Sequence, residues 1–327
     1  MSGGQGKRKV KSGGKILIPI IIMLFVIYEA RSIFKEIDIN QVLDILRNIP
    51  NTYLVIFLIS AIISISFLCF YDVVLADHYK YNINKFKVFV VAWIAHSFND
   101  IIGFGGLTGA TLRTVLFKDE NIDTKDMINF NMILIPTTIV GLSVMCYLGV
   151  LNVFKIYPLL HSQKWLWIVI LIFCAFLPIY YFLDRFTWLS NKLEKLNLYF
   201  EGSVNLKVRL TLLSTCEWIV RSIMFFTIAK YFKGDASFLS VTGVNILACI
   251  AALISFIPGG VGSFDLVAIM GLKAMGYSPN SALSITLLFR LYYFIIPWII
   301  GVILWIARSV LRSNKLGNHI RKEEDVQ

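Results

Sequence analysis

Long apolar runs dominate this sequence and decide what it can fold into. Five runs of spanning length lie at residues 53–76, 128–151, 165–183, 210–229 and 282–307, and a shorter one lies at 16–27. A helix needs about 20 apolar residues to cross the hydrocarbon core of a bilayer. Hydrophobic residues make up 57% of the chain and charged residues only 16%, whereas a soluble domain carries about 25% charged residues. The sequence therefore predicts an all-α polytopic membrane protein with about six full spans, the first of them a retained signal anchor because no convincing small-residue cleavage site follows it.

Two further apolar stretches are interrupted and do not fit a single span. Residues 88–117 are broken by Gly103, Gly105, Gly106 and Gly109, and residues 238–275 are broken by Pro258, Gly259, Gly260 and Gly262. Proline removes a backbone donor and glycine weakens a helix, so each stretch is expected to open there. Open backbone survives at membrane depth only where it is buried in protein or lines a wet cavity. Each break is therefore predicted to be the tip of a re-entrant hairpin and a candidate site, although small residues four apart, such as Gly105 and Gly109, also serve simply to pack helices closely.

The lysine and arginine residues favour one orientation of these segments. With the N-terminus inside and both broken stretches returning to their face of entry, the cytoplasmic segments 1–15, 77–87, 118–127, 184–209 and 308–327 hold 20 basic residues, and the outer loops 35–51, 153–164 and 230–237 hold 6. If both stretches crossed fully, the basic loop 184–209 would lie outside, which the positive-inside rule disfavours. The chain is therefore expected to have both termini in the cytoplasm. Its predicted divisions are a basic tail at 1–15, a transmembrane domain at 16–307 and a charged tail at 308–327.

The same orientation predicts an inverted repeat. The first hairpin enters from the cytoplasm and the second from outside, as in transporters whose broken helices meet near the bilayer midplane. The halves also share an order of polar residues: Asp72 precedes the first break and Arg113 follows it, while Glu217 precedes the second break and Asp265 follows it.

Charged residues inside the apolar segments are the main candidates for function. The five that stand out are Asp72, Arg113, Glu217, Asp265 and Arg290. A charge in mid-membrane costs about 2.5–3.5 kcal/mol on insertion scales, so it faces a partner or a cavity. Structural ion pairs would meet that need: Arg221 lies four residues after Glu217 and would neutralise it. Asp72 and Arg290 lie near enough to the ends of their spans for their side chains to reach the membrane surface.

The coincidence of charges with breaks favours a substrate site over purely structural pairing. Each glycine break is followed by a charge, of opposite sign in the two halves. Opened helix ends offer donors to a phosphate, beside Arg113 and Arg290, while Asp72, Glu217 and Asp265 would receive ammonium groups. Such a cavity suits a substrate that carries both signs of charge. Ion conduction would use the same residues.

Other classes of function find little support. The net charge of +11 comes from loops and tails, and no basic stripe with interleaved aromatic residues indicates nucleic-acid binding. The five cysteines lie inside apolar runs without CxxC spacing, and the four histidines are scattered singly, so no metal site is expected. No ATP-binding loop is present. The sequence therefore predicts no catalytic residue and no cofactor, and it places the energy source in a gradient, the membrane potential or the lipid concentration difference.

At these motifs the sequence resembles a known family. It is similar to the flippase domain of the bacterial multiple peptide resistance factor, in the lysylphosphatidylglycerol synthase transmembrane family. The resemblance rests on Tyr71-Asp72-Val73, Gly103-Phe104-Gly105-Gly106 with Arg113, Glu217-Trp218, Ser255-Phe256-Ile257-Pro258-Gly259-Gly260 with Gly262 and Phe264-Asp265-Leu266, and Arg290. These pieces run from the second span to the last, and the Ser-Phe-Ile-Pro-Gly-Gly block ending in Phe-Asp is the specific one.

The resemblance implies a function at the bacterial cell membrane. It implies that aminoacylated phosphatidylglycerol, chiefly the lysyl form, is moved to the outer leaflet, which confers resistance to cationic antimicrobial peptides. Asp72, Arg113, Glu217, Asp265 and Arg290 match the family positions associated with flipping. Full-length members continue into a cytoplasmic domain that transfers lysine from charged tRNA to the lipid. This chain ends at Gln327, so it is not expected to catalyse that transfer.

Three functional hypotheses follow. The chain is a lysyl-lipid flippase, the non-catalytic half of a split or truncated lysyltransferase, or a transporter of another anionic or glycosylated lipid. The first expects a phospholipid substrate, and the second expects a separate synthase domain as partner. The sequence leaves a homo-oligomer open.

Overall fold

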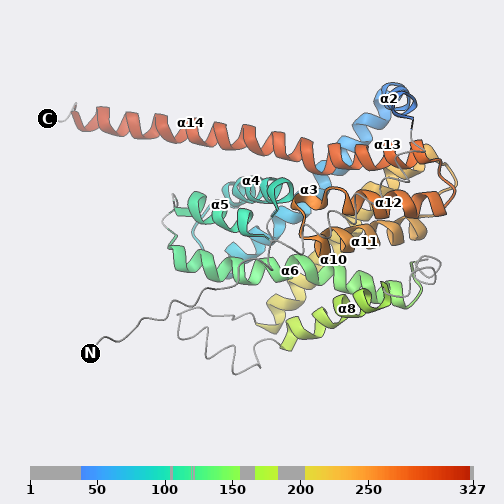
Figure 1. The fold of residues 1–327 in the computed structure, drawn as a ribbon. Coiled ribbons are helices and arrows are strands. Elements are labelled where there is room, and N and C mark those ends of the chain that lie inside the picture. The colour runs from blue at the N-terminus through green and yellow to red at the C-terminus, as the bar shows by residue number, and fades with distance from the viewer. Residues whose placement is uncertain are drawn as a thin grey trace, which may run out of the picture.

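The structure is a computed structural model that describes residues 38–103, 106–118, 120, 122–154, 166–182 and 203–324. In chain order its elements are α2 (Ile39–Arg47), α3 (Asn51–His78), α4 (Lys85–Ile102), α5 (Leu107–Lys118), α6 (Thr124–Val150), α8 (Leu166–Phe182), α10 (Val204–Phe232), α11 (Phe238–Ser255), the 3-10 turn η2 (Pro258–Gly260), α12 (Ser263–Ala274), α13 (Pro279–Arg290), the π-helical turn η3 (Leu291–Ile295) and α14 (Ile296–Glu324). Every regular element within these ranges is helical, so the all-α prediction is confirmed (Figure 1).

Five helices are long and apolar enough to cross a membrane. They are α3, α6, α10, α11 and the continuous helix from Pro279 to Leu311. Four of these match predicted full spans. The predicted span at 165–183 contains α8, which covers all the residues of that run that the structure describes. The run at 16–27 and the tail at 1–15 lie outside the described residues. We had expected α11 only as a hairpin arm, yet its 18 residues reach the length of a span.

Both broken stretches fold back on themselves as helical hairpins. A Cβ atom placed on Gly109 of α5 would lie 3.2 Å from the carbonyl oxygen of Ala95 on α4. A Cβ atom on Gly271 of α12 would lie 2.7 Å from the side chain of Val244 on α11. Helix α4 packs on α5 and α11 packs on α12, so the two arms of each hairpin lie side by side. The predicted fold-back at each break is confirmed, and the re-entrant placement of the hairpins in a membrane stays a prediction.

The hairpins enter the bundle from opposite ends. Helix α3 runs antiparallel to α10, since the ring of Tyr53 at the start of α3 contacts that of Tyr231 at the end of α10, with 4.5 Å between centroids and a tilt of 54°. The first hairpin begins beside the other end of α3, where Lys85 lies 3.3 Å from Asp77. The second begins just after α10 and returns to the same end, where Lys233 donates to the Met275 carbonyl. Each half thus contributes a long helix followed by a hairpin, in inverted orientation.

The tips of the two hairpins contact each other. A Cβ atom on Gly103 would lie 3.1 Å from the Cα atom of Pro258, and one on Gly259 would lie 3.4 Å from the Asp100 carbonyl oxygen. The last turn of α4 therefore packs directly against η2. Only residues without bulky side chains allow two backbones to approach this closely.

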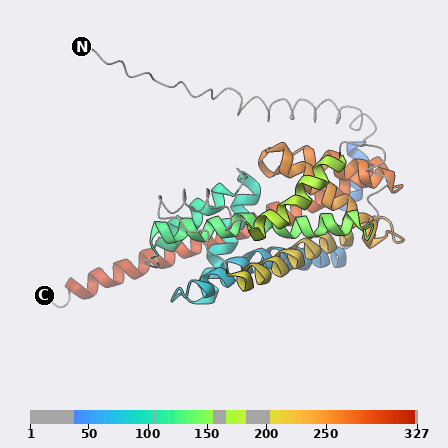
Figure 2. The same ribbon diagram turned by 90° about the horizontal axis from the view of Figure 1, so that it is seen from below.

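Long helices surround this central contact. Helix α6 packs against α10, where Gly141 donates its N–H to Ser214 Oγ at 2.8 Å. Helix α8 lies along α6 at the edge of the bundle, and α14 packs on α4 and then extends beyond the other helices (Figures 1 and 2). Arg308 of α14 donates to the Leu116 carbonyl at the base of the first hairpin. The segment expected as a charged tail thus continues as helix to Glu324.

Candidate functional site

The first charged cluster ties the first hairpin to α3. Arg113 of α5 donates from Nε to Asp72 Oδ1 at 2.5 Å and from Nη2 to Asp72 Oδ2 at 3.1 Å. His96 of α4 places Nε2 2.9 Å from the same Asp72 oxygen. Asp72 is 0% exposed, Arg113 3% and His96 6%. A two-point contact between guanidinium and carboxylate is the strongest form of ion pair, so this cluster fixes both hairpin arms against α3.

The second cluster holds the second break in shape. Arg290 at the end of α13 forms a two-point ion pair with Asp265 of α12, in which Nη2 lies 2.7 Å from Oδ2. The same guanidinium donates to the carbonyls of Gly259 at 3.2 Å and Gly260 at 3.0 Å. Asp265 in turn accepts from the Gly262 N–H at 2.8 Å, which caps α12. These contacts satisfy backbone groups that the break leaves without helical partners.

A π-helical turn follows Arg290 directly. Pro297 has no N–H to give to the Tyr293 carbonyl, and the Ile296 N–H bonds instead to Leu291, one residue further back. Tyr293, within this turn, contacts Arg221 of α10.

The third cluster lies on α10 against that turn. Glu217 is 1% exposed, and its Oε1 lies 3.2 Å from Arg221 Nε outside hydrogen-bond geometry. The Arg221 guanidinium is sandwiched between the rings of Trp218 and Tyr293, 4.4 Å from each centroid. It also donates to the Tyr293 hydroxyl. Arg221 thus links Glu217 of α10 to Tyr293 of η3. The ion pair of Glu217 with Arg221 is looser than the other two, because its 3.2 Å contact is not a hydrogen bond.

All five predicted charges are thus paired, which corrects one expectation. Asp72 does not snorkel toward a span end, because it is fully buried and bonded to Arg113. The acids Asp72, Glu217 and Asp265 each have an arginine partner in this conformation, and their contact with a substrate stays a prediction. The predicted pairing of Glu217 with Arg221 is confirmed.

Two polar residues in the first hairpin were missed. His96 was read as one of four isolated histidines, but it completes the Asp72 cluster. Asp100 lies in the last turn of α4, three residues before Gly103, and its Oδ2 is shielded from solvent without a hydrogen-bond partner among the described residues. The only signal for either in the sequence was a polar residue within an apolar run close to a glycine break.

The predicted backbone positions divide into turn residues and packing residues. Five glycines have positive φ, namely Gly103, Gly106, Gly259, Gly260 and Gly262, and Pro258 begins the turn η2. Gly109 is helical and packs against α4, where its N–H lies 3.4 Å from Asn99 Oδ1. Gly105 lies outside the described residues. The two breaks therefore hold left-handed conformations that other residues rarely adopt.

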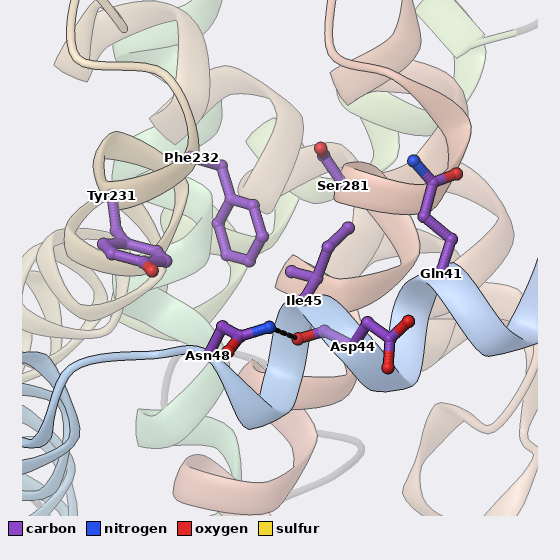
Figure 3. A pocket seen from close by; sticks show the side chains of 7 residues that line it. All are labelled: Gln41, Asp44, Ile45, Asn48, Tyr231, Phe232 and Ser281. Atoms are coloured by element: carbon purple, nitrogen blue, oxygen red, sulfur yellow. Dashed lines mark hydrogen bonds between the residues drawn. The ribbon is translucent and has the colours of Figure 1, made fainter.

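Two cavities lie at opposite ends of the bundle, away from the ion pairs. One, of 490 Å³, is bounded by α2, the end of α10 and the start of α13; Figure 3 shows its lining of Gln41, Asp44, Ile45, Asn48, Tyr231, Phe232 and Ser281. The other, of 150 Å³, lies where α3 ends and α10 begins. No residue of the three ion pairs lines either cavity. Within the described ranges, no group of three or more His, Cys, Asp or Glu side chains is arranged to hold a metal ion.

Comparison with known proteins identifies relatives along nearly the whole chain. The profile described as "Lysylphosphatidylglycerol synthase TM region" matches residues 15–301. A phosphatidylglycerol lysyltransferase of Bacillus subtilis is 30% identical over 317 residues, which are 95% of this chain and 36% of the relative. Proteins of the same name from Staphylococcus haemolyticus and Staphylococcus aureus are 29% and 30% identical over 298 residues, 91% of this chain and 34% of each relative. The chain spans about a third of the length of these relatives.

Proposed function

The chain belongs to the lysylphosphatidylglycerol synthase transmembrane family, and on that premise we propose that it moves an aminoacylated phosphatidylglycerol, chiefly the lysyl form, from the inner to the outer leaflet. The observation that carries the proposal is the meeting of two oppositely directed helical hairpins at their broken tips. Paired broken segments of this kind form substrate sites in transporters, because their unwound backbone is stable only in protein or beside a wet cavity.

The charge pattern supports a substrate with both signs of charge. The proposed substrate contacts are Asp72, Arg113, Glu217, Asp265 and Arg290, with the tip backbone around Gly103 and Gly259. In the present conformation these charges bind each other. Arginine is suited to phosphate by its fork of donors, and carboxylates are suited to ammonium groups. Release of any one pair would expose one group of each sign to a lipid headgroup.

The proposal includes an orientation and a cellular role. The first hairpin opens from the end of the bundle rich in lysine and arginine, which we place in the cytoplasm of a bacterial cell, with both termini on that side. Display of a cationic lipid on the outer leaflet would lower the negative charge of the surface and weaken the binding of cationic antimicrobial peptides.

A second candidate function rests on the names and lengths of the relatives. They are phosphatidylglycerol lysyltransferases of which this chain spans about a third. The chain would then be the membrane part of a split or truncated lysyltransferase. Copurification of a lysyl-transferring domain with this chain, and faster lysyl transfer in the presence of the chain, would support this alternative.

The test of flipping is the amount of lysylphosphatidylglycerol in the outer leaflet of cells that express a separate synthase domain. We compare the wild-type chain, Arg113→Ala, Asp265→Asn and an empty vector at matched membrane expression. Asp77→Asn is the control, since this acid is exposed and pairs only with Lys85 at the end of α3. We expect exposure to rise with the wild type and the control and to fall with the two variants. Exposure equal to the empty vector in the wild type would refute lysyl-lipid flipping.

A further inference from the structure

Asp100, at the contact of the two hairpin tips, is an acid for which no arginine partner is present among the described residues. Each of Asp72, Glu217 and Asp265 has its own arginine. Asp100 has neither an ion pair nor a hydrogen bond to its Oδ2 among the residues that the structure describes, although this oxygen is shielded from solvent. A buried carboxylate without a partner is unfavourable by several kcal/mol. Among these four acids, Asp100 is therefore the one without a cationic partner within the described residues.

The position of Asp100 links it to both hairpins. Its carbonyl oxygen packs against Gly259 of the second tip, at 3.4 Å from where a Cβ atom would lie. Its neighbour Asn99 receives the N–H of Gly109, which holds the end of α4 against α5. The charges close enough to act on its carboxylate are Arg221, Glu217 and Arg113, and both arginines are already engaged with other acids. The free carboxylate thus lies where the two inverted halves join.

We propose that Asp100 binds the primary ammonium group of the lipid headgroup and so selects aminoacylated phosphatidylglycerol over phosphatidylglycerol itself. This inference rests on the proposed function and names the residue that gives it headgroup specificity. An ammonium group supplies the missing cation and three donors for the unpartnered oxygen. Phosphatidylglycerol has the same phosphate and glycerol but no cation, so it gains nothing from Asp100. The three arginine-paired acids are not needed for this step and keep their partners.

Binding of lipids to the purified chain tests the inference directly. The probes are short-chain lysylphosphatidylglycerol, short-chain phosphatidylglycerol and lysine amide, which carries the ammonium groups without a lipid. In the wild type we expect the lysyl lipid to bind at least about tenfold more tightly than phosphatidylglycerol, the scale of one charged hydrogen bond in a buried site. Asp100→Asn and Asp100→Ser should reduce that ratio to within about twofold, while the exposed-acid control Asp77→Asn keeps it. Weak binding of lysine amide that is equally lost in Asp100→Asn would show that the cation is recognised without the lipid.

The stability of the variants separates recognition from a structural role. Because no described residue bonds Asp100 Oδ2, its neutralisation should leave the thermal midpoint in detergent unchanged or raise it. Variants that fail to fold, or that melt as early as a variant of a paired acid, would overturn the inference by showing a structural partner. A wild type without headgroup preference, or an Asp100→Asn variant that keeps the preference, would overturn it as well.

A separate transport measurement distinguishes this inference from the proposed function. Reconstituted chain is assayed for movement of fluorescent lysylphosphatidylglycerol and phosphatidylglycerol across liposomes. If the wild type binds the lysyl lipid selectively through Asp100 but moves neither lipid, flipping fails and the recognition site stands. If the wild type moves the lysyl lipid and Asp100→Asn moves it with the same preference, flipping stands and the recognition site fails.

Discussion

The ion pair between Asp72 and Arg113 gives the most quantitative prediction. Arg113→Met keeps an unbranched side chain in the bundle but removes the guanidinium and its two hydrogen bonds to Asp72, at 2.5 and 3.1 Å. The carboxylate is 0% exposed and would keep only the contact with His96 at 2.9 Å. Removal of one partner from a buried pair costs about 3–5 kcal/mol, because the remaining charge is stranded in a medium of low dielectric constant. We expect a loss of stability of that size.

The double variant Asp72→Asn/Arg113→Met provides the test of the reasoning. It removes the stranded charge together with its partner, so we expect most of the stability to return, leaving a deficit of about 1 kcal/mol from the lost hydrogen bonds. The assay is the thermal midpoint of the monodisperse peak in size-exclusion chromatography in detergent, for the wild type, both single variants and the double variant. If the double variant is as unstable as Arg113→Met alone, burial of an unpaired charge is not the cause and the reasoning is refuted.

Two further predictions concern helix packing and the second break. Gly141→Ala should destabilise the chain by about 2 kcal/mol or more, since its Cβ atom would lie 2.4 Å from the backbone of Ser214. The control Gly234→Ala, with nothing within 4 Å, should have little effect on the thermal midpoint in detergent. Equal midpoints of the two variants would contradict the close contact of α6 with α10. Arg290→Lys keeps the charge, but an ammonium group cannot bind both the Asp265 carboxylate and the Gly259 carbonyl as the guanidinium does. We therefore expect lipid movement in liposomes to fall severalfold with the chain still folded. Unchanged transport would argue against a role for the bond from Arg290 to the Gly259 carbonyl.

The helices, the breaks and their inverted order are predictable from the sequence because they depend on local composition. A run of apolar residues such as 53–76 needs no partner to be recognised as a span. The Pro258-Gly259-Gly260 block interrupts a helix wherever it occurs, and the structure has the break at that position. The distribution of basic residues then indicates which ends lie together.

The partners of the charged residues were not predictable in the same way. Asp72 and Arg113 are 41 residues apart, and Asp265 and Arg290 are 25 apart, so their pairing depends on how separate helices pack. Only Glu217 and Arg221, one helical turn apart, carry a local signal. Asp100 was overlooked for the converse reason: its importance comes from the absence of a partner among the described residues, which composition does not reveal.

The geometry of the pairs determines which substitutions are informative about transport. Asp72 with Arg113 fixes the first hairpin to α3, and Asp265 with Arg290 fixes the shape of the second break. Loss of transport after substitution of any of these four is therefore expected whether or not the residue touches the lipid, because a displaced hairpin also abolishes a transport site. Asp100 differs from them, since it bonds nothing that would be displaced and still lies at the contact of the tips. A substitution there that changes headgroup preference without changing stability would support a direct interaction of the carboxylate with the headgroup cation.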